Sequence, residues 1–157
     1  QRHVSEAIVH AMTNVRRHLM VVPGFLLVGS GLLPLGGCAP SAPAADPDGT
    51  ATLESLFQAR RSNVVVEVGG IVQRTLSDDT EGSRHHRFIV RLPTGRTLLV
   101  AHNIDLADRV PLTAGDAVRL RGEYEWNDQG GVVHWTHHDP RGERPGGWIE
   151  HEGRRYR

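Results

Sequence analysis

The chain has 157 residues, of which 38% are hydrophobic and 23% charged, the composition of a folded globular protein. Its 18 arginines, with no lysine, balance 18 acidic residues. This balance excludes a broad field for polyanions, so nucleic acid is not an expected partner. The single cysteine, Cys38, excludes an intrachain disulfide and a cysteine-based metal site.

Residues 1–37 have the order of an export leader. The true start is expected at Met12, followed by two adjacent arginines and an apolar run over residues 19–35. The run ends in Leu-Gly-Gly before Cys38, which resembles a lipobox, the motif at which signal peptidase II cuts before a lipid-bearing cysteine. Prolines and glycines interrupt the run, which argues against an ordinary transmembrane anchor.

The lipobox predicts that Cys38 anchors the mature chain to a membrane. By resemblance to Gram-negative lipoproteins, Ala39 after the cysteine favours the periplasmic face of the outer membrane. Residues 38–50 are rich in proline and alanine, which indicates a tether. We therefore expect one exported domain over residues 51–157, with its partners in the cell envelope.

The domain is predicted to open with a short helix over residues 51–60, where Leu53, Leu56 and Phe57 recur at helical spacing. The first strand is predicted over residues 64–72, with Gly69-Gly70 indicating a bulge or sharp bend. Further strands are predicted over residues 87–92, 96–101, 118–126 and 132–136, with an irregular crossover or short helix over 103–112.

The fourth predicted strand has a clear alternation of faces. Its inward residues are Val118, Leu120, Tyr124 and Trp126, and its outward residues are Arg119, Arg121, Glu123 and Glu125. Five strands with an insert between the third and fourth have the order of an OB-fold. We predict an all-β fold, a small five-stranded OB-fold-like barrel with a short N-terminal helix. Another small β-barrel or a sandwich is the alternative.

The segment after residue 138 is rich in turn residues yet contains Trp148, Ile149 and Tyr156. Such a segment has apolar surface to bury. We therefore predict a C-terminal tail that packs on the barrel and covers an open edge or the barrel mouth.

Four stretches of the domain resemble one bacterial family. They are SRHHRF at 83–88, LLVAHNIDL at 98–106, RGEYEW at 121–126 and HWTHHDP at 134–140. They resemble the family called domain of unknown function 3465, from about Val64 to the C-terminus. The resemblance implies that the chain is related to this family, which has no established activity.

Histidines are the most unusual feature of the domain. The candidate metal or polar site consists of His85, His102, His134, His137, His138 and Asp139. Imidazoles with a carboxylate suit zinc or another divalent ion, and a catalytic site would need three of them to converge. No recognised metal-binding spacing occurs. The alternative is that these histidines donate hydrogen bonds to loop carbonyls or stack at the surface.

A second candidate is a ligand face that combines cations with aromatic rings, as in OB-folds that bind oligomers. Its residues are Arg87, Arg91, Arg119, Arg121, Tyr124, Trp126 and Trp135. Glutamates interleave with these arginines, so ion pairs across strands on a solvated face are the alternative.

These features favour a membrane-tethered binding module that is not catalytic. The expected partner is a small or oligomeric ligand or an envelope protein. This expectation rests on the predicted fold alone. The alternative is a metal-dependent hydrolase, for example a phosphodiesterase or nuclease, that uses the histidines. A scaffold lipoprotein without a small ligand is the third hypothesis.

Overall fold

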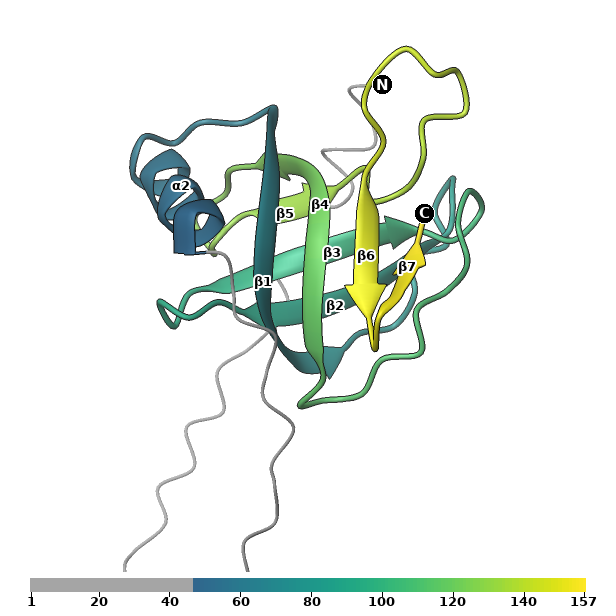
Figure 1. Cartoon of the computed structure of the whole chain (residues 1–157), viewed down its shortest axis with the longest axis horizontal. Coiled ribbons are helices and arrows are strands. Elements are labelled where there is room, and N and C mark those ends of the chain that lie inside the picture. The colour runs from purple at the N-terminus through teal and green to yellow at the C-terminus, as the bar shows by residue number, and fades with distance from the viewer. Residues whose placement is uncertain (1–46) are drawn as a thin grey trace, which may run out of the picture. The chain divides into compact units, whose positions relative to one another are not determined.

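The computed structural model describes residues 47–157, so the predicted leader, Cys38 and most of the tether lie outside the described residues. The elements are α2 (Pro47–Gln58), β1 (Val64–Thr75), β2 (His85–Arg91), β3 (Thr97–Asn103), β4 (Ala117–Glu125), β5 (Val132–His134), β6 (Trp148–His151) and β7 (Arg154–Tyr156). Figure 1 shows their arrangement. Among these residues no helix has the length and apolarity that a membrane crossing requires.

Five strands close into a barrel. The order is β1-β2-β3-β5-β4, and β4 pairs again with β1. Neighbouring strands are antiparallel except β3 and β5, which are parallel. This order confirms the predicted five-stranded OB-fold-like barrel. The closed ring also excludes the sandwich alternative.

The first strand closes the barrel because it pairs with two partners in turn. Residues 64–71 pair with β4, and residues 71–75 pair with β2. Of the bulge or sharp bend predicted at Gly69-Gly70, the bulge is wrong, because the pairing with β4 continues through both glycines and the register shifts between Val72 and Arg74 instead. Gly70 instead permits close approach of β2, since a Cβ there would lie 2.6 Å from the Arg91 carbonyl oxygen.

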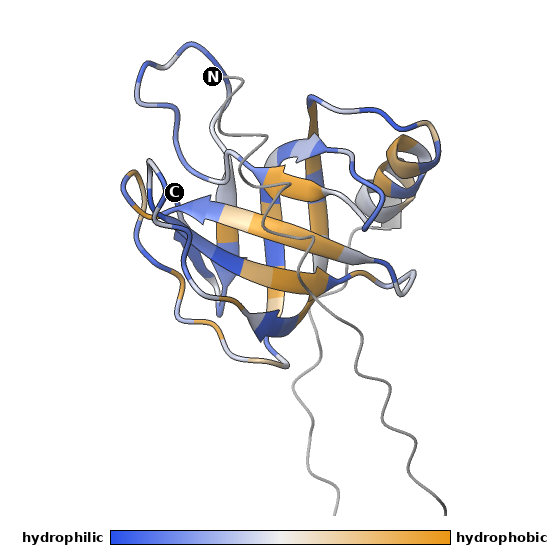
Figure 2. Ribbon diagram, turned by 180° about the vertical axis from the view of Figure 1, so that it is seen from behind, coloured by the Kyte–Doolittle hydropathy of each residue, from blue (hydrophilic) through white to orange (hydrophobic). Residues whose placement is uncertain are grey.

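The fourth strand alternates between core and solvent as predicted. Val118, Leu120 and Tyr124 are fully buried, whereas the residues between them are half-buried, apart from Gly122. Seen from behind, the central parts of β2 and β3 are also strongly hydrophobic (Figure 2). The core therefore lies inside the ring of strands.

Two strands include histidines that were expected outside them or at their ends. β2 begins at His85 and β3 continues to Asn103, so His86 and His102 become cross-strand partners. β5 is shorter than predicted and ends at His134, because Trp135 adopts a left-handed φ of 55° that no regular strand contains. The stretch 103–112 is the irregular crossover.

The helix begins at Pro47, four residues before the predicted start. Proline suits the first turn of a helix, because its φ is already helical and its missing N–H would have no intrahelical partner there. Leu53 and Leu56 are buried in the core. Arg96 donates from Nε to Glu54 at 2.8 Å, which ties the helix to the start of β3.

The tail forms two extra strands outside the ring. β6 pairs with residues 119–121 of β4, next to residues 123–125 that pair with the short β5 (Figure 1). β7 pairs with β6. Ile149 is fully buried, and Trp148 and Tyr156 are nearly so. The prediction that the tail packs on the barrel and covers an open edge is confirmed.

Candidate functional site

Three of the predicted site histidines, with His86, gather at one end of the barrel. His85 and His86 open β2 opposite the end of β3, where His86 faces His102. This end is hydrophilic in Figure 2. The charges of His137, His86 and His85 all contribute to lowering the pKa of His102, so the four imidazoles are electrostatic neighbours. We call these four residues the histidine end of the barrel.

His102 is the most tightly held of them. Its Nε2 lies 3.1 Å from the Asp108 carbonyl oxygen, which can only accept, so Nε2 carries the proton. Its Nδ1 then accepts from the Thr136 hydroxyl at 2.8 Å. Burial lowers the pKa of His102 to about 4, so the neutral ring is stable in this position at pH 7.

His86 is also buried and packs beside Phe88, with ring centroids 5.4 Å apart. Its Nδ1 has no hydrogen-bond partner among the described residues. Burial, assisted by the charge of Arg109, lowers the pKa of His86 to about 4. Both histidines in this strand pair therefore act as neutral core residues.

The loop after β5 contains the other predicted ligands. His137 donates from Nδ1 to the His138 carbonyl oxygen at 2.6 Å, and burial lowers the pKa of His137. The exposed His138 ring meets the His137 ring edge-on. The Asp139 carboxylate accepts backbone N–H bonds from Arg141, Glu143 and Arg144. Asp139 therefore shapes the loop.

The pKa of Asp139 reflects that role. Desolvation is the largest single influence and raises it, but the three backbone donors together hold the pKa below its ordinary value. A carboxylate with this many donors is already well solvated by the protein. Its hydrogen bonds fix the loop that lies over β4.

The six residues of the predicted metal site do not converge. Among residues 47–157, the group of three or more ligand atoms lying within 4.8 Å of one another consists of Glu123, Glu125 and His134. His134 is the one predicted site residue in it. Burial lowers the pKa of His134, while the carboxylates of Glu125 and Glu123 oppose this effect.

The residues of the predicted cation and aromatic face do not share one surface, because they lie in different surroundings. Arg119 pairs with Glu67 at 3.0 Å, and Arg121 lies 4.0 Å from the same carboxylate. Arg87 donates from Nε to the Ser77 carbonyl oxygen, and Arg91 is exposed at the end of β2. Ion pairs across strands thus explain part of this face, as the alternative anticipated.

Two aromatic residues predicted for that face, Tyr124 and Trp126, pack in or against the core instead. Tyr124 is fully buried and belongs to the core, because it lies on the inward face of β4. Trp126 packs against the core, with its ring 6.2 Å from that of Phe57 on α2 and the Arg60 guanidinium 5.3 Å from its centroid. Neither ring is available as a platform for a ligand.

Trp135 lies beside a groove of about 250 Å³ between β1, β4 and the loop after β5, which we call the tail groove. Its lining side chains include Val65, Arg121, Glu123, Trp135, Arg144 and Pro145. The Arg144 guanidinium covers the Trp135 ring at 4.5 Å and also donates to Glu123 at 3.2 Å. Val65, which is 50% exposed, is a large apolar residue open to solvent there.

Backbone geometry fixes the groove. A bulky residue with a positive φ is uncommon and marks a turn or a strained position, and Trp135 is one. Gly147 lies directly on the barrel, because a Cβ there would come 2.0 Å from the Trp135 carbonyl oxygen and 2.5 Å from that of Arg121. The loop is therefore held against β4 by backbone packing.

Sequence reasoning did not select Glu123, Glu125, Val65 or Arg144 as site residues. The turn at 127–131 indicates that β4 and β5 form a hairpin, but a hairpin centred on this turn would place residue 123 opposite residue 135, one position beyond its observed partner His134. Arg144 and Val65 gave no such signal. Their meeting depends on how the tail folds back over β4.

Residues 37–157 match the model of a family described as "Protein of unknown function (DUF3465)". A search of curated proteins finds no match to this chain.

Proposed function

The chain belongs to the DUF3465 family, and we propose that it is an exported lipoprotein whose barrel binds a small ligand in the tail groove. Cys38 carries the lipid, and the mature chain is held at the periplasmic face of the envelope, in the outer membrane. The tail groove is the observation that supports ligand binding. The lipobox and the tether sequence support the anchoring part.

The groove has the composition of a ligand site. Small-molecule sites combine apolar and aromatic walls with a few polar groups that fix orientation. Here Trp135, Val65 and Pro145 provide the walls, and Arg121 and Arg144 provide charge-assisted donors. The left-handed backbone of Trp135 supports a functional role, since strain of this kind concentrates at binding sites.

The ligand class follows from charge and volume. Two arginines face one glutamate, so the lining has an excess of positive charge. The volume of about 250 Å³ suits a single ring or sugar unit. We propose a small anion with one flat apolar face, either an aromatic acid or a sugar acid from an envelope polymer. An envelope protein could present the same group.

The hydrolase alternative has less support. It needs three of His85, His102, His134, His137, His138 and Asp139 to share one centre, and the described residues do not bring three of them within 4.8 Å. His102 and Asp139 are also committed to hydrogen bonds within the protein. Binding without catalysis is the function that we propose.

The groove is tested by two-dimensional NMR of the full chain in detergent, with the indole N–H of Trp135 as the probe. Benzoate and glucuronate should shift this resonance, and the neutral benzyl alcohol and glucose should not. Arg121→Gln should weaken binding by about 10- to 150-fold, because a hydrogen bond to a charged group contributes about 1.5–3 kcal/mol. Whichever acid binds more tightly identifies the source of the ligand.

The matched control is Arg91→Gln, which removes an exposed arginine outside the groove lining. It should leave the affinity unchanged. Equal binding of the neutral compounds, an equal loss in both arginine variants, or no shift with either acid would each contradict the proposed groove.

Anchoring is tested separately by expressing the full chain in a bacterium supplied with an alkyne-labelled fatty acid. The wild type should carry the label and appear in the membrane fraction. Cys38→Ser should lose the label, since it removes the one cysteine of the chain. A labelled Cys38→Ser chain, or an unlabelled wild type, would overturn the lipoprotein assignment.

A further inference from the structure

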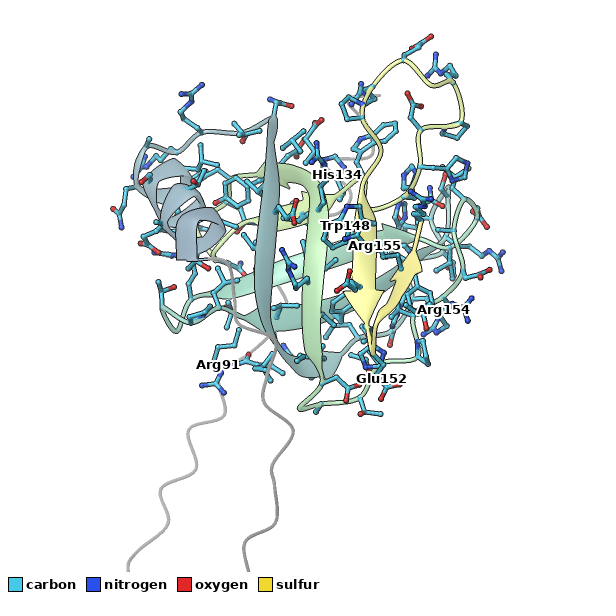
Figure 3. All side chains as sticks on the ribbon, in the orientation of Figure 1. Arg91, His134, Trp148, Glu152, Arg154 and Arg155 are labelled. Atoms are coloured by element: carbon cyan, nitrogen blue, oxygen red, sulfur yellow. The ribbon has the colours of Figure 1, made fainter. Side chains whose placement is uncertain are left out.

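A compact group of metal-ligating side chains lies on the outer face of the barrel where β4 meets β5. Glu123 and Glu125 are alternate residues of β4 and therefore project from the same face of the strand. His134 is the cross-strand partner of Glu123. Figure 3 shows His134 along the same side of β4 as Trp148 on β6, so the tail borders this group.

The three ligand atoms are close enough to share one ion. The His134 Nε2 atom lies 3.5 Å from Oε1 of Glu125 and 4.0 Å from Oε1 of Glu123, and all three ligand atoms lie within 4.8 Å of one another. In a tetrahedral zinc site with bonds of about 2.0 Å, the ligand atoms lie about 3.3 Å apart. Small side-chain rotations would close the difference.

Burial distinguishes this group from an ordinary acidic patch. The side chains of Glu123 and His134 are 18% exposed and that of Glu125 is 21% exposed. Two carboxylates this close and this buried repel each other and lose hydration, which a cation between them would offset. Arg144 pairs with Oε2 of Glu123, whereas Oε1 of the same carboxylate is the oxygen that lies near His134.

The unused nitrogen of His134 is a second and independent observation. Its Nε2 is inaccessible to solvent and makes no hydrogen bond among the described residues. Buried polar atoms in native proteins nearly always have a partner. Oε1 of Glu125, 3.5 Å away, can pair with this nitrogen only when the ring is protonated, so for the neutral ring a metal ion would supply the missing partner.

We infer that Glu123, Glu125 and His134 form a binding site for one divalent transition-metal ion of the zinc class. One imidazole with two carboxylates suits zinc and its neighbours in the first transition row better than Ca²⁺ or Mg²⁺, which prefer oxygen alone. Three protein ligands leave a fourth position for water or an anion. None of the other five residues of the predicted metal site contributes to it.

The site goes beyond the proposed function, because ligand binding in the tail groove does not require a metal. Glu123 lines both, but Trp135 and Arg121 belong to the groove alone and Glu125 and His134 to the metal group alone. Variants at these residues therefore separate the two proposals.

The test is calorimetric titration of ZnCl₂ into the full chain, purified in detergent and stripped with a chelator. We expect one zinc ion per chain. Glu125→Gln and His134→Gln should each weaken binding at least tenfold, because loss of even an outer-shell partner costs that much. Zinc should also raise the melting temperature of the wild type more than that of the variants at the same zinc concentration. Either variant decides the test if the other fails to fold.

The matched control is His138→Gln, which removes an exposed histidine outside the group. Its zinc affinity should equal that of the wild type. No stoichiometric binding by the wild type, or unchanged affinity in Glu125→Gln and His134→Gln, would overturn the site. A loss of binding in His138→Gln would assign the zinc to the loop histidines and would overturn it equally.

Discussion

Acidification from pH 6.5 to pH 4 should lower the free energy of unfolding of the barrel by roughly 3 kcal/mol for each of the buried histidines His86 and His102. Burial lowers both pKa values from 6.5 to about 4. Over this window the unfolded chain binds more protons than the folded one. Stability is therefore full above pH 6.5 and falls as the pH decreases toward 4.

Urea denaturation at pH 7, 5.5 and 4.5, followed by circular dichroism, measures this effect. His86→Leu should remove the His86 share of the pH dependence, roughly 3 kcal/mol, because leucine fills a similar volume and His86 Nδ1 has no partner to lose. The control, His138→Leu at an exposed position, should keep the wild-type dependence. A stability that is constant from pH 7 to 4.5 would show that these two rings are not buried as neutral groups.

The strands could be predicted from the sequence because burial in a barrel is periodic. The alternation in β4 separates Leu120 and Tyr124 from Arg121 and Glu123 with no knowledge of the partners. The tail was also predictable, because Trp148 and Ile149 have more apolar surface than a free segment can leave exposed. In both cases composition and spacing were sufficient.

The ends of elements and the candidate site could not be predicted in the same way. β5 stops at His134 because Trp135 has a left-handed backbone conformation. A tryptophan in the sequence does not predict that conformation, since bulky residues rarely adopt it. Which histidines meet depends on strand register, and a shift of one residue moves a side chain to the other face. The turn at 127–131 indicates that β4 pairs with β5, but the register that places Glu123 opposite His134 is one residue away from a hairpin centred on that turn, and the tail groove depends on how the tail folds.

Gly131→Ala should destabilise the barrel by about 2–5 kcal/mol, the sum of two separate costs. The first is conformational, since Gly131 has a φ of 95° that residues with a Cβ rarely adopt. The second is steric, because an added Cβ would lie 2.2 Å from Cε2 of Tyr124. That ring is fully buried, so it has no free space into which to move.

The matched control is Gly95→Ala, which separates the two costs. Gly95 has a similar φ of 86°, but a Cβ there would meet no atom within 4 Å. It should cost only about 1–2 kcal/mol. Denaturant unfolding of both variants gives the difference, which is the cost of the clash. Equal costs would show that Tyr124 does not pack against this turn.

The clash can also be relieved, which makes the comparison decisive. Tyr124→Leu destabilises the chain alone by leaving a cavity, but in the double variant it provides the space that the new Cβ needs. The two substitutions should therefore cost less together than the sum of their separate costs. Because β5 begins at the next residue, strain at Gly131 should also displace His134 from Glu123 and weaken zinc binding.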